Sequence, residues 1–159
     1  MSQFTHLDDA GAARMVDVSA KAATARTAVA TGVVRTTQEV IALLRTDGLP
    51  KGDALATARI AGIMAAKRTP DLVPLCHPIA LTGVQVDLEI AATEVRITAT
   101  VRTTDRTGVE MEALTAVAGA GLALHDMIKA VDPAAVLDAV RVERKDGGKT
   151  GTWARPEGR

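Results

Sequence analysis

The sequence predicts a mixed α/β chain of the α+β class, in which helices cover one face of an antiparallel sheet. Two segments, 84–90 and 95–101, carry apolar residues at every second position, and Ala91-Ala92-Thr93 lies in the turn between them, so they predict a β-hairpin. Helical segments flank this hairpin, and a further strand lies beyond each of them. The order contains β-α-β-β-α-β, which is typical of a ferredoxin-like sandwich.

The length of 159 residues predicts one domain, 1–159, with two peripheral segments. Residues 1–12 are small and polar and predict a flexible N-terminal arm. A short strand is expected at 13–18, and a Thr- and Val-rich strand follows at about 26–35. The Gly-rich segment from about 146 to 159 predicts a mobile tail.

Cap residues predict where the first two helices begin and end. Thr36 with Glu39 three residues later forms a capping box, and this helix should end at Asp47-Gly48. Asp53 is expected to cap a second helix that ends before Pro70. The second helix is mostly Ala and Gly, so we expect it to be buried in close contact with another backbone.

The second half of the chain predicts one long helix and a last strand. The helix runs over 109–131 and ends at Asp132-Pro133, and the strand covers 139–144. Helices on one sheet face leave the other face uncovered. Because the chain is 47% hydrophobic, we expect self-association to cover that face.

Composition excludes several classes of protein. Lys plus Arg and Asp plus Glu are 19 each, and aromatic residues are 1%, so neither a basic surface nor base-stacking platforms are expected for nucleic acid. No secretory signal and no apolar run of about 18 residues is present, so we expect a cytoplasmic protein without a membrane span. The single Cys76 fits a reducing compartment, and one Cys with three scattered His predicts no zinc site.

Two short motifs suggest chemistry but have ordinary explanations. Gly147-Gly148-Lys149-Thr150 resembles the end of a P-loop, yet Glu143 occupies the position of its first Gly, and no helix can follow. A basic Gly-rich tail that wraps a phosphate and a solvated tail both remain open. Cys76-His77 suggests a thiolate pair, but a packed Cys beside a hydrogen-bonded His explains it equally well.

The long helix carries ionisable residues at both ends. Glu110 and Glu112 lie in its first turn, where the helix dipole alone favours carboxylates. Asp126 and Lys129 share a face near its end and could form a simple ion pair. Glu112 and Asp126 are about 21 Å apart along the axis and within about 40° of one face. One chain cannot bring both into one small pocket, so a shared role requires a second subunit or two sites.

Several segments together resemble the cyclic pyranopterin monophosphate synthase family, the molybdenum cofactor biosynthesis protein C family. They span nearly the whole chain in the family's order. These segments are THLDD at 5–9, ARMVDVSAK at 13–21, KGDALATARIAGIMAAKRT at 51–69, LVPLCHP at 72–78, TGVEMEALTAV at 107–117, HDMIKAVD at 125–132 and GGKTG at 147–151.

The resemblance implies a ferredoxin-like fold, a homohexamer built as a trimer of dimers, and an active site at a subunit interface. It implies a lyase that converts (8S)-3′,8-cyclo-7,8-dihydroguanosine 5′-triphosphate to cyclic pyranopterin monophosphate and releases diphosphate. No cofactor is required, and whether Mg²⁺ assists with the phosphates is left open. The implied catalytic residues are Asp126, Lys129 and Lys51. The implied substrate-binding residues are Leu75, Cys76, His77, Met111, Glu112, Arg26, Lys67 and Lys145.

The chain departs from the family pattern at His125 and Ile128, where Tyr and Cys are usual, and in AGAGL at 118–122. None of these positions is an implied catalytic residue. A non-catalytic oligomer that binds a pterin or nucleotide phosphate is the main competing function, and a structural interaction protein is the third. The presence of Lys51, Asp126 and Lys129 together favours the enzyme.

Overall fold

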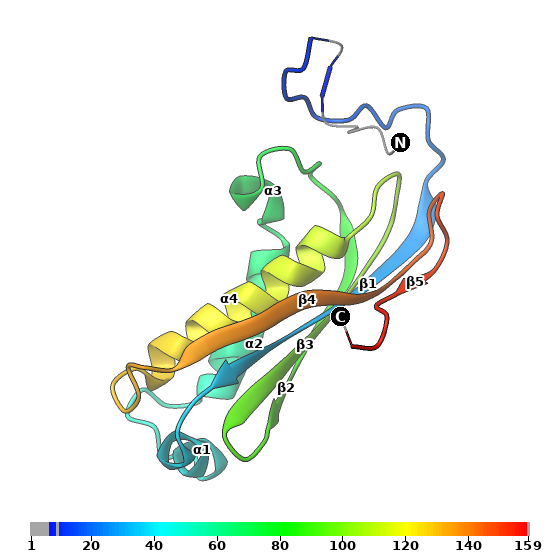
Figure 1. Ribbon diagram of the computed structural model, residues 1–159. Helices are drawn as coiled ribbons and strands as arrows, with labels where there is room; N and C mark the ends of the chain where they lie inside the picture. The colour runs from blue at the N-terminus through cyan, green and yellow to red at the C-terminus, as the bar shows by residue number, and fades with distance from the viewer. Residues whose placement is uncertain (1–6, 9, 159) are drawn as a thin grey trace.

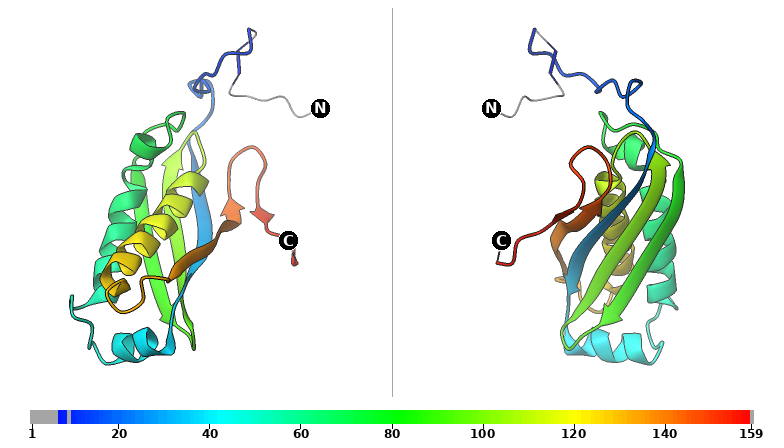
Figure 2. Two further views of the ribbon diagram at one scale, coloured as in Figure 1. Left: turned by 60° about the vertical axis from the view of Figure 1, so that its left-hand side comes forward. Right: turned by 90° about the vertical axis from the view of Figure 1, so that its right-hand side faces the viewer.

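The structure, a computed structural model, describes residues 7–8 and 10–158 (Figure 1). Its elements are β1 (Thr24–Arg35), α1 (Gln38–Arg45), α2 (Ala54–Ala66), α3 (Thr69–Leu72), β2 (Leu81–Ile90), β3 (Glu94–Asp105), α4 (Glu110–Ile128), β4 (Val136–Asp146) and β5 (Trp153–Ala154). The strands form one sheet in the order β2-β3-β1-β4-β5, and every neighbouring pair is antiparallel. Helices α2 and α4 cover one face, and α1 lies across one end (Figure 2). The α+β class and the ferredoxin-like arrangement are confirmed.

The core lies between the sheet and the α2–α4 layer. In β1, Ala28, Ala30 and Val34 are fully buried, and the residues between them are less so, as alternation along a strand requires. Ile97 on β3 and Leu124 on α4 are also fully buried. Each large apolar side chain buried in this way contributes roughly 1.5–3 kcal/mol to the free energy of unfolding.

Small residues allow α2 and α4 to approach closely. Ala54, Ala58, Gly62 and Ala66 form the buried stripe of α2. A Cβ on Gly62 would lie 2.8 Å from the carbonyl oxygen of Ala116 on α4. The expected close packing of the small-residue helix is therefore confirmed on this stripe, although the opposite side of α2 is exposed.

The uncovered sheet face is polar, so the expectation of an apolar face in need of a cover is wrong. Thr31 and Thr98 pair across β1 and β3 on this face, and the Thr31 hydroxyl donates to Glu143 at 2.6 Å. Arg102 is exposed on the same side of β3. The large apolar side chains of the chain lie mainly in the core and on the helices.

Exposed apolar side chains occur on the helix layer instead. Ile60 and Met64 on α2 are 58% and 50% exposed, and Leu122 on α4 is 67% exposed. A surface with large apolar side chains that are exposed in this way is typical of a protein contact.

Several predicted boundaries shift. Residues 13–18 form no strand, and their one ladder contact is an isolated bridge between Leu7 and Ala13. Thr37, and not Thr36, caps α1, because the Thr36 hydroxyl donates to Asp132. Asp53 caps α2 as expected.

The ends of the helices and the last strand also differ from the predictions. Helix α2 ends at Ala66, and Pro70 lies in the first turn of the short helix α3 rather than ending α2. The long helix is α4, three residues shorter at its C-terminal end than expected. Strand β4 is longer than predicted, and the C-terminal tail contains β5, which pairs with β4. Part of the N-terminal arm, residues 1–6 and 9, lies outside the described residues.

Candidate active site

Helix α4 separates two groups of candidate residues. It runs without a break from Glu110 to Ile128, so Glu112 and Asp126 are about 21 Å apart along its axis. The glycines at 119 and 121 do not interrupt it. The structure thus places ten of the eleven predicted site residues of one chain in two separate groups, called here half-sites, one at each end of α4.

The half-site at the C-terminal end of α4 is a cluster of Lys51, Asp126 and Lys129, called here the lysine cluster. The ammonium of Lys51 lies 2.8 Å from Asp126 Oδ2, and that of Lys129 lies 2.7 Å from Oδ1. Lys51 also donates to the Asp126 carbonyl at 3.0 Å. These contacts bring together all three residues that the resemblance implies to be catalytic.

The two lysines hold Asp126 as a carboxylate. Hydrogen bonds first from Lys129 and then from Lys51, with the charges of both, lower the pKa of Asp126 to about 2. All three side chains are about half exposed. Ion pairs with this exposure add little to stability, so stability alone does not explain the cluster.

Local structure explains how Lys51 reaches α4. It lies on the turn between α1 and α2, where Gly52 adopts a φ of +87°, and the Gly52 amide donates to the Leu49 carbonyl. Asp53 then caps α2. The antiparallel packing of α2 on α4 puts the start of α2 beside the end of α4, and Lys51 with it (Figure 1).

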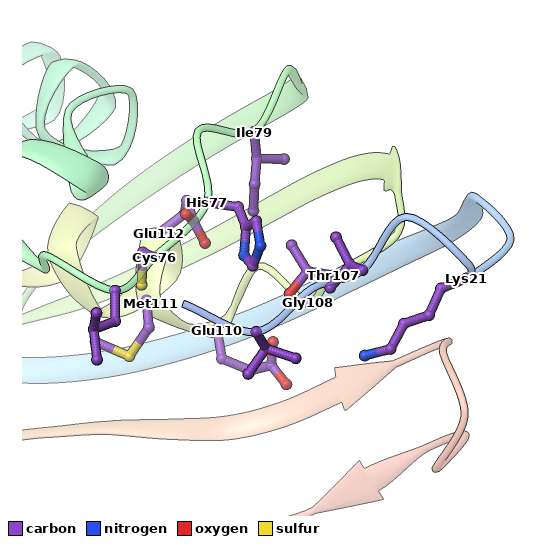
Figure 3. A pocket seen from close by; sticks show the side chains of 12 residues that line it. Lys21, Cys76, His77, Ile79, Thr107, Gly108, Glu110, Met111 and Glu112 are labelled. Atoms are coloured by element: carbon purple, nitrogen blue, oxygen red, sulfur yellow. The ribbon is translucent and has the colours of Figure 1, made fainter. Parts of the chain in front are cut away.

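The half-site at the N-terminal end of α4 contains a cavity of about 360 Å³, called here the ring cavity. Leu75, Cys76 and His77 line it from the loop after α3, and Met111 and Glu112 line it from the first turn of α4. Figure 3 shows Cys76, His77, Met111 and Glu112 around this cavity. Five predicted substrate-binding residues therefore meet in one cavity. The segment that was expected to be a strand at 13–18 contributes Val16 and Val18 to the same wall.

Glu112 is the buried ionisable group of this cavity. Glu112 is 2% exposed. Among the described residues, no cationic side chain lies within salt-bridge distance of its carboxylate. Burial raises the pKa of Glu112 to about 7, and the nearby Glu110 charge adds to this. Glu112 is therefore poised to hold or release a proton near neutral pH.

The raised pKa of Glu112 predicts a pH-dependent penalty to stability. Between pH 4.5 and about 7 the folded chain keeps a proton that the unfolded chain releases, so stability falls as pH rises and stays lower above pH 7. Because Gln does not ionise, Glu112→Gln should raise the free energy of unfolding at pH 8 by up to about 3 kcal/mol. At pH 4.5 the gain should largely vanish.

Thermal unfolding at the two pH values measures this difference, and Glu39→Gln, an exposed glutamate on α1, is the matched control. A Glu112→Gln gain of the same size at pH 4.5 and pH 8 would show that packing, and not ionisation, is responsible.

A second cavity of about 190 Å³ adjoins the ring cavity and is called here the cationic cavity. Lys21, Thr107, Gly108 and Glu110 line both. The basic residues of the cationic cavity are Lys21, Arg26, Arg106, Lys145 and Lys149. Its two carboxylates are Glu110 and Asp146, which leaves an excess of positive charge.

The carboxylates compensate little of that charge. Asp146 accepts two hydrogen bonds from Arg144, at 2.8 and 2.9 Å, and so faces a cation outside the cavity. Glu110 lies 3.5 Å from the ammonium of Lys145. For Arg26, no carboxylate lies within salt-bridge distance in the part of the chain that the structure describes. A cavity with these properties is suited to a multivalent anion such as a polyphosphate.

Ten of the eleven predicted site residues lie in one of these half-sites. The exception is Lys67, which caps the C-terminal end of α2 and lines neither the ring cavity nor the cationic cavity. Sequence reasoning did not assign Lys21 and Arg106 to the site, and it left Lys149 open as part of a tail that could wrap a phosphate. The sequence did carry a signal, since Lys21 and Lys149 lie in segments that carry the family resemblance. Only the fold, however, brings Lys21, Arg106 and Lys149 into one cavity.

Comparison with known protein families matches most of the chain. A family model described as the MoaC family matches residues 15–148, which include the lysine cluster, the ring cavity and all of the cationic cavity except Lys149 and Thr150. The chain belongs to the MoaC family. The P-loop alternative for Gly147–Thr150 is also rejected, because β5 and not a helix follows it.

Three relatives of this MoaC chain are named as cyclic pyranopterin monophosphate synthases. A protein of Mycobacterium tuberculosis (strain ATCC 25618 / H37Rv), named cyclic pyranopterin monophosphate synthase 2, is 65% identical over 96% of this chain and 92% of its own length. A Streptomyces coelicolor protein named cyclic pyranopterin monophosphate synthase is 67% identical over 96% and 90%. A Nocardioides protein with that name is 62% identical over 97% and 96%.

Two further findings concern this MoaC chain. Within residues 7–8 and 10–158, no group of three or more His, Cys, Asp or Glu side chains could hold a metal ion. Across the same residues, no helix combines the length and apolar character that a membrane crossing needs.

Proposed function

We propose that the protein is a lyase that converts (8S)-3′,8-cyclo-7,8-dihydroguanosine 5′-triphosphate to cyclic pyranopterin monophosphate, with release of diphosphate. Family membership and the shared name of relatives at 62–67% identity support the reaction. The observation that carries the proposal is the lysine cluster, because a protein that only binds a phosphorylated pterin has no need of it.

The two adjoining cavities suit the two parts of this substrate. The fused ring system fits the ring cavity, where Leu75 and Met111 offer apolar contact and Glu112 offers a carboxyl group. The triphosphate fits the cationic cavity beside it, where Arg26 and Lys145 face the phosphates. Cations placed there stabilise the charge that develops as the bond from the α-phosphorus to the bridging oxygen breaks and diphosphate leaves.

The lysine cluster supplies proton transfer. Because Asp126 is held as a carboxylate, it is a poor acid at neutral pH, and we assign proton donation and acceptance to Lys51 and Lys129. Asp126 fixes both ammonium groups in place.

The complete active site is built from two chains. The two half-sites of one chain lie about 21 Å apart, so the cluster of one subunit has to meet the cavities of another. Exposed Ile60, Met64 and Leu122 on the helix layer provide an apolar surface for such contact. We propose a homohexamer, arranged as a trimer of dimers, as the assembly. In this assembly Lys67 of one chain is assigned to an active site that two chains form together.

No resident cofactor takes part in the proposed reaction, and Mg²⁺ that arrives with the triphosphate would belong to the substrate. A cytoplasmic location and the absence of a nucleic-acid partner remain predictions.

Turnover of the cyclic triphosphate by the purified protein tests the function. We expect one diphosphate released for each cyclic pyranopterin monophosphate formed. Binding of the triphosphate without conversion, by correctly assembled protein, would favour the non-catalytic carrier instead.

The thiol of Cys76 is not expected to act as a covalent nucleophile. Burial raises its pKa, and the Glu112 charge adds to the increase, so the protonated thiol dominates at neutral pH. Cys76→Ser should therefore keep more than about a tenth of wild-type turnover. Complete loss of turnover in Cys76→Ser, with substrate affinity and thermal midpoint unchanged, would assign chemistry to the thiol.

A further inference from the structure

The turn after β4 packs directly on Arg26 of β1. Strand β4 ends at Asp146, which pairs with Thr27, and two glycines with φ values of +93° and +75° follow. A Cβ on Gly147 would overlap the Ala25 carbonyl oxygen, and a Cβ on Gly148 would overlap Arg26 Nη1. A side chain at 148 would therefore adopt an unfavourable backbone conformation and would require the guanidinium or the turn to shift.

The guanidinium of Arg26 is fixed in the cationic cavity. Its Nε donates to the Asp105 carbonyl at 2.9 Å, and its Nη2 donates to the Arg106 carbonyl at 3.1 Å. Its remaining terminal nitrogen, Nη1, is the atom that faces Gly148. Both hydrogen-bond acceptors are neutral carbonyls, so the full positive charge is available to an anion.

We infer that Gly148 is a positioning residue that holds the Arg26 guanidinium in place for the phosphates of the substrate. The inference rests on the proposed function, in which the cationic cavity takes the triphosphate. A side chain at 148 would force one of two changes. Either Arg26 moves and breaks its two carbonyl hydrogen bonds, or the turn lifts and carries Lys149 and Thr150, the partner of Lys145, away from the cavity.

A double-mutant cycle on inorganic diphosphate binding tests this role. We expect Arg26→Ala and Gly148→Ala each to weaken diphosphate binding to the full chain about tenfold. The double variant should bind no more weakly than Arg26→Ala alone, because the methyl group added at position 148 overlaps nothing once the guanidinium is absent. A purely structural role of Gly148 would weaken binding by the same factor in both backgrounds.

Gly151→Ala is the matched control. Gly151 lies in the same segment with a φ of +63°, but a Cβ there would meet no atom within 4 Å. The variant reproduces the backbone strain without the overlap, so its diphosphate affinity should stay within about twofold of wild type. If Gly148→Ala alone fails to fold, the double variant should fold, since the overlap is gone.

The outcomes separate this inference from the proposed function. Wild-type affinity in Gly148→Ala, or equal losses in the two backgrounds, would overturn the positioning role while Arg26→Ala still weakens binding. If Arg26→Ala leaves diphosphate affinity unchanged, the phosphate assignment of the cationic cavity fails, and the positioning role fails with it. If the double variant also fails to fold, the overlap between residue 148 and the Arg26 guanidinium is not the cause of misfolding, and the inference is overturned.

Discussion

Asp126→Asn is expected to lower kcat about 1,000-fold, with substrate affinity changed by less than about threefold. The carboxylate binds Lys51 through one oxygen and Lys129 through the other. Asn has nearly the same shape but one acceptor oxygen and no charge, so it can hold at most one of the two ammonium groups. At least one lysine is then released, and the two ammonium groups, no longer neutralised by a shared carboxylate, repel each other and lose their common orientation.

Steady-state kinetics with the cyclic triphosphate measures this loss, and the thermal midpoint separates it from unfolding. Because the cluster is half exposed, the midpoint should shift by less than about 2 °C. Asp87→Asn, at an exposed aspartate on β2 that accepts a hydrogen bond from Gln85, should leave kcat unchanged. A kcat for Asp126→Asn within tenfold of wild type would contradict the assigned role of Asp126.

Local signals predicted most of the fold. The period-2 segments indicated the β2–β3 hairpin, and the Asp53 cap placed the start of α2, because both depend on neighbours in sequence. The strand expected at 13–18 did not form because a few apolar residues do not make a strand without a partner strand, and Val16 and Val18 instead line the ring cavity. Strand β4 was underestimated because its pairing with β1 includes bulges that break the alternation of the sequence.

The residues of the site were also visible in the sequence, but their grouping was not. Helical periodicity was enough to show that Glu112 and Asp126 lie at opposite ends of one helix. It could not show that Lys51 meets Asp126, because that contact depends on how α2 packs on α4. Nor could it show that Glu112 is buried, which is the main cause of its raised pKa.

Mixed oligomers of two inactive variants should regain turnover. Lys129→Ala damages the lysine cluster of its own chain, and Glu112→Ala damages the ring cavity of its own chain. If each active site takes one half-site from each of two chains, random mixing leaves about one quarter of the sites intact. The recovered turnover should therefore approach a quarter of the wild-type value.

A second mixture is the control. Lys51 and Lys129 contact the same Asp126, so Lys51→Ala and Lys129→Ala both damage the lysine cluster. No chain in that mixture carries an intact cluster, and subunit exchange should restore nothing. The contrast between the two mixtures depends only on which half-site each residue occupies.

The decisive measurement is diphosphate release by equimolar mixtures after subunit exchange, with mixed oligomers verified by native mass spectrometry. An active site shared between chains predicts about a quarter of wild-type turnover for Lys129→Ala with Glu112→Ala, and none for Lys129→Ala with Lys51→Ala. Verified mixed oligomers that stay inactive in both mixtures would contradict the shared active site.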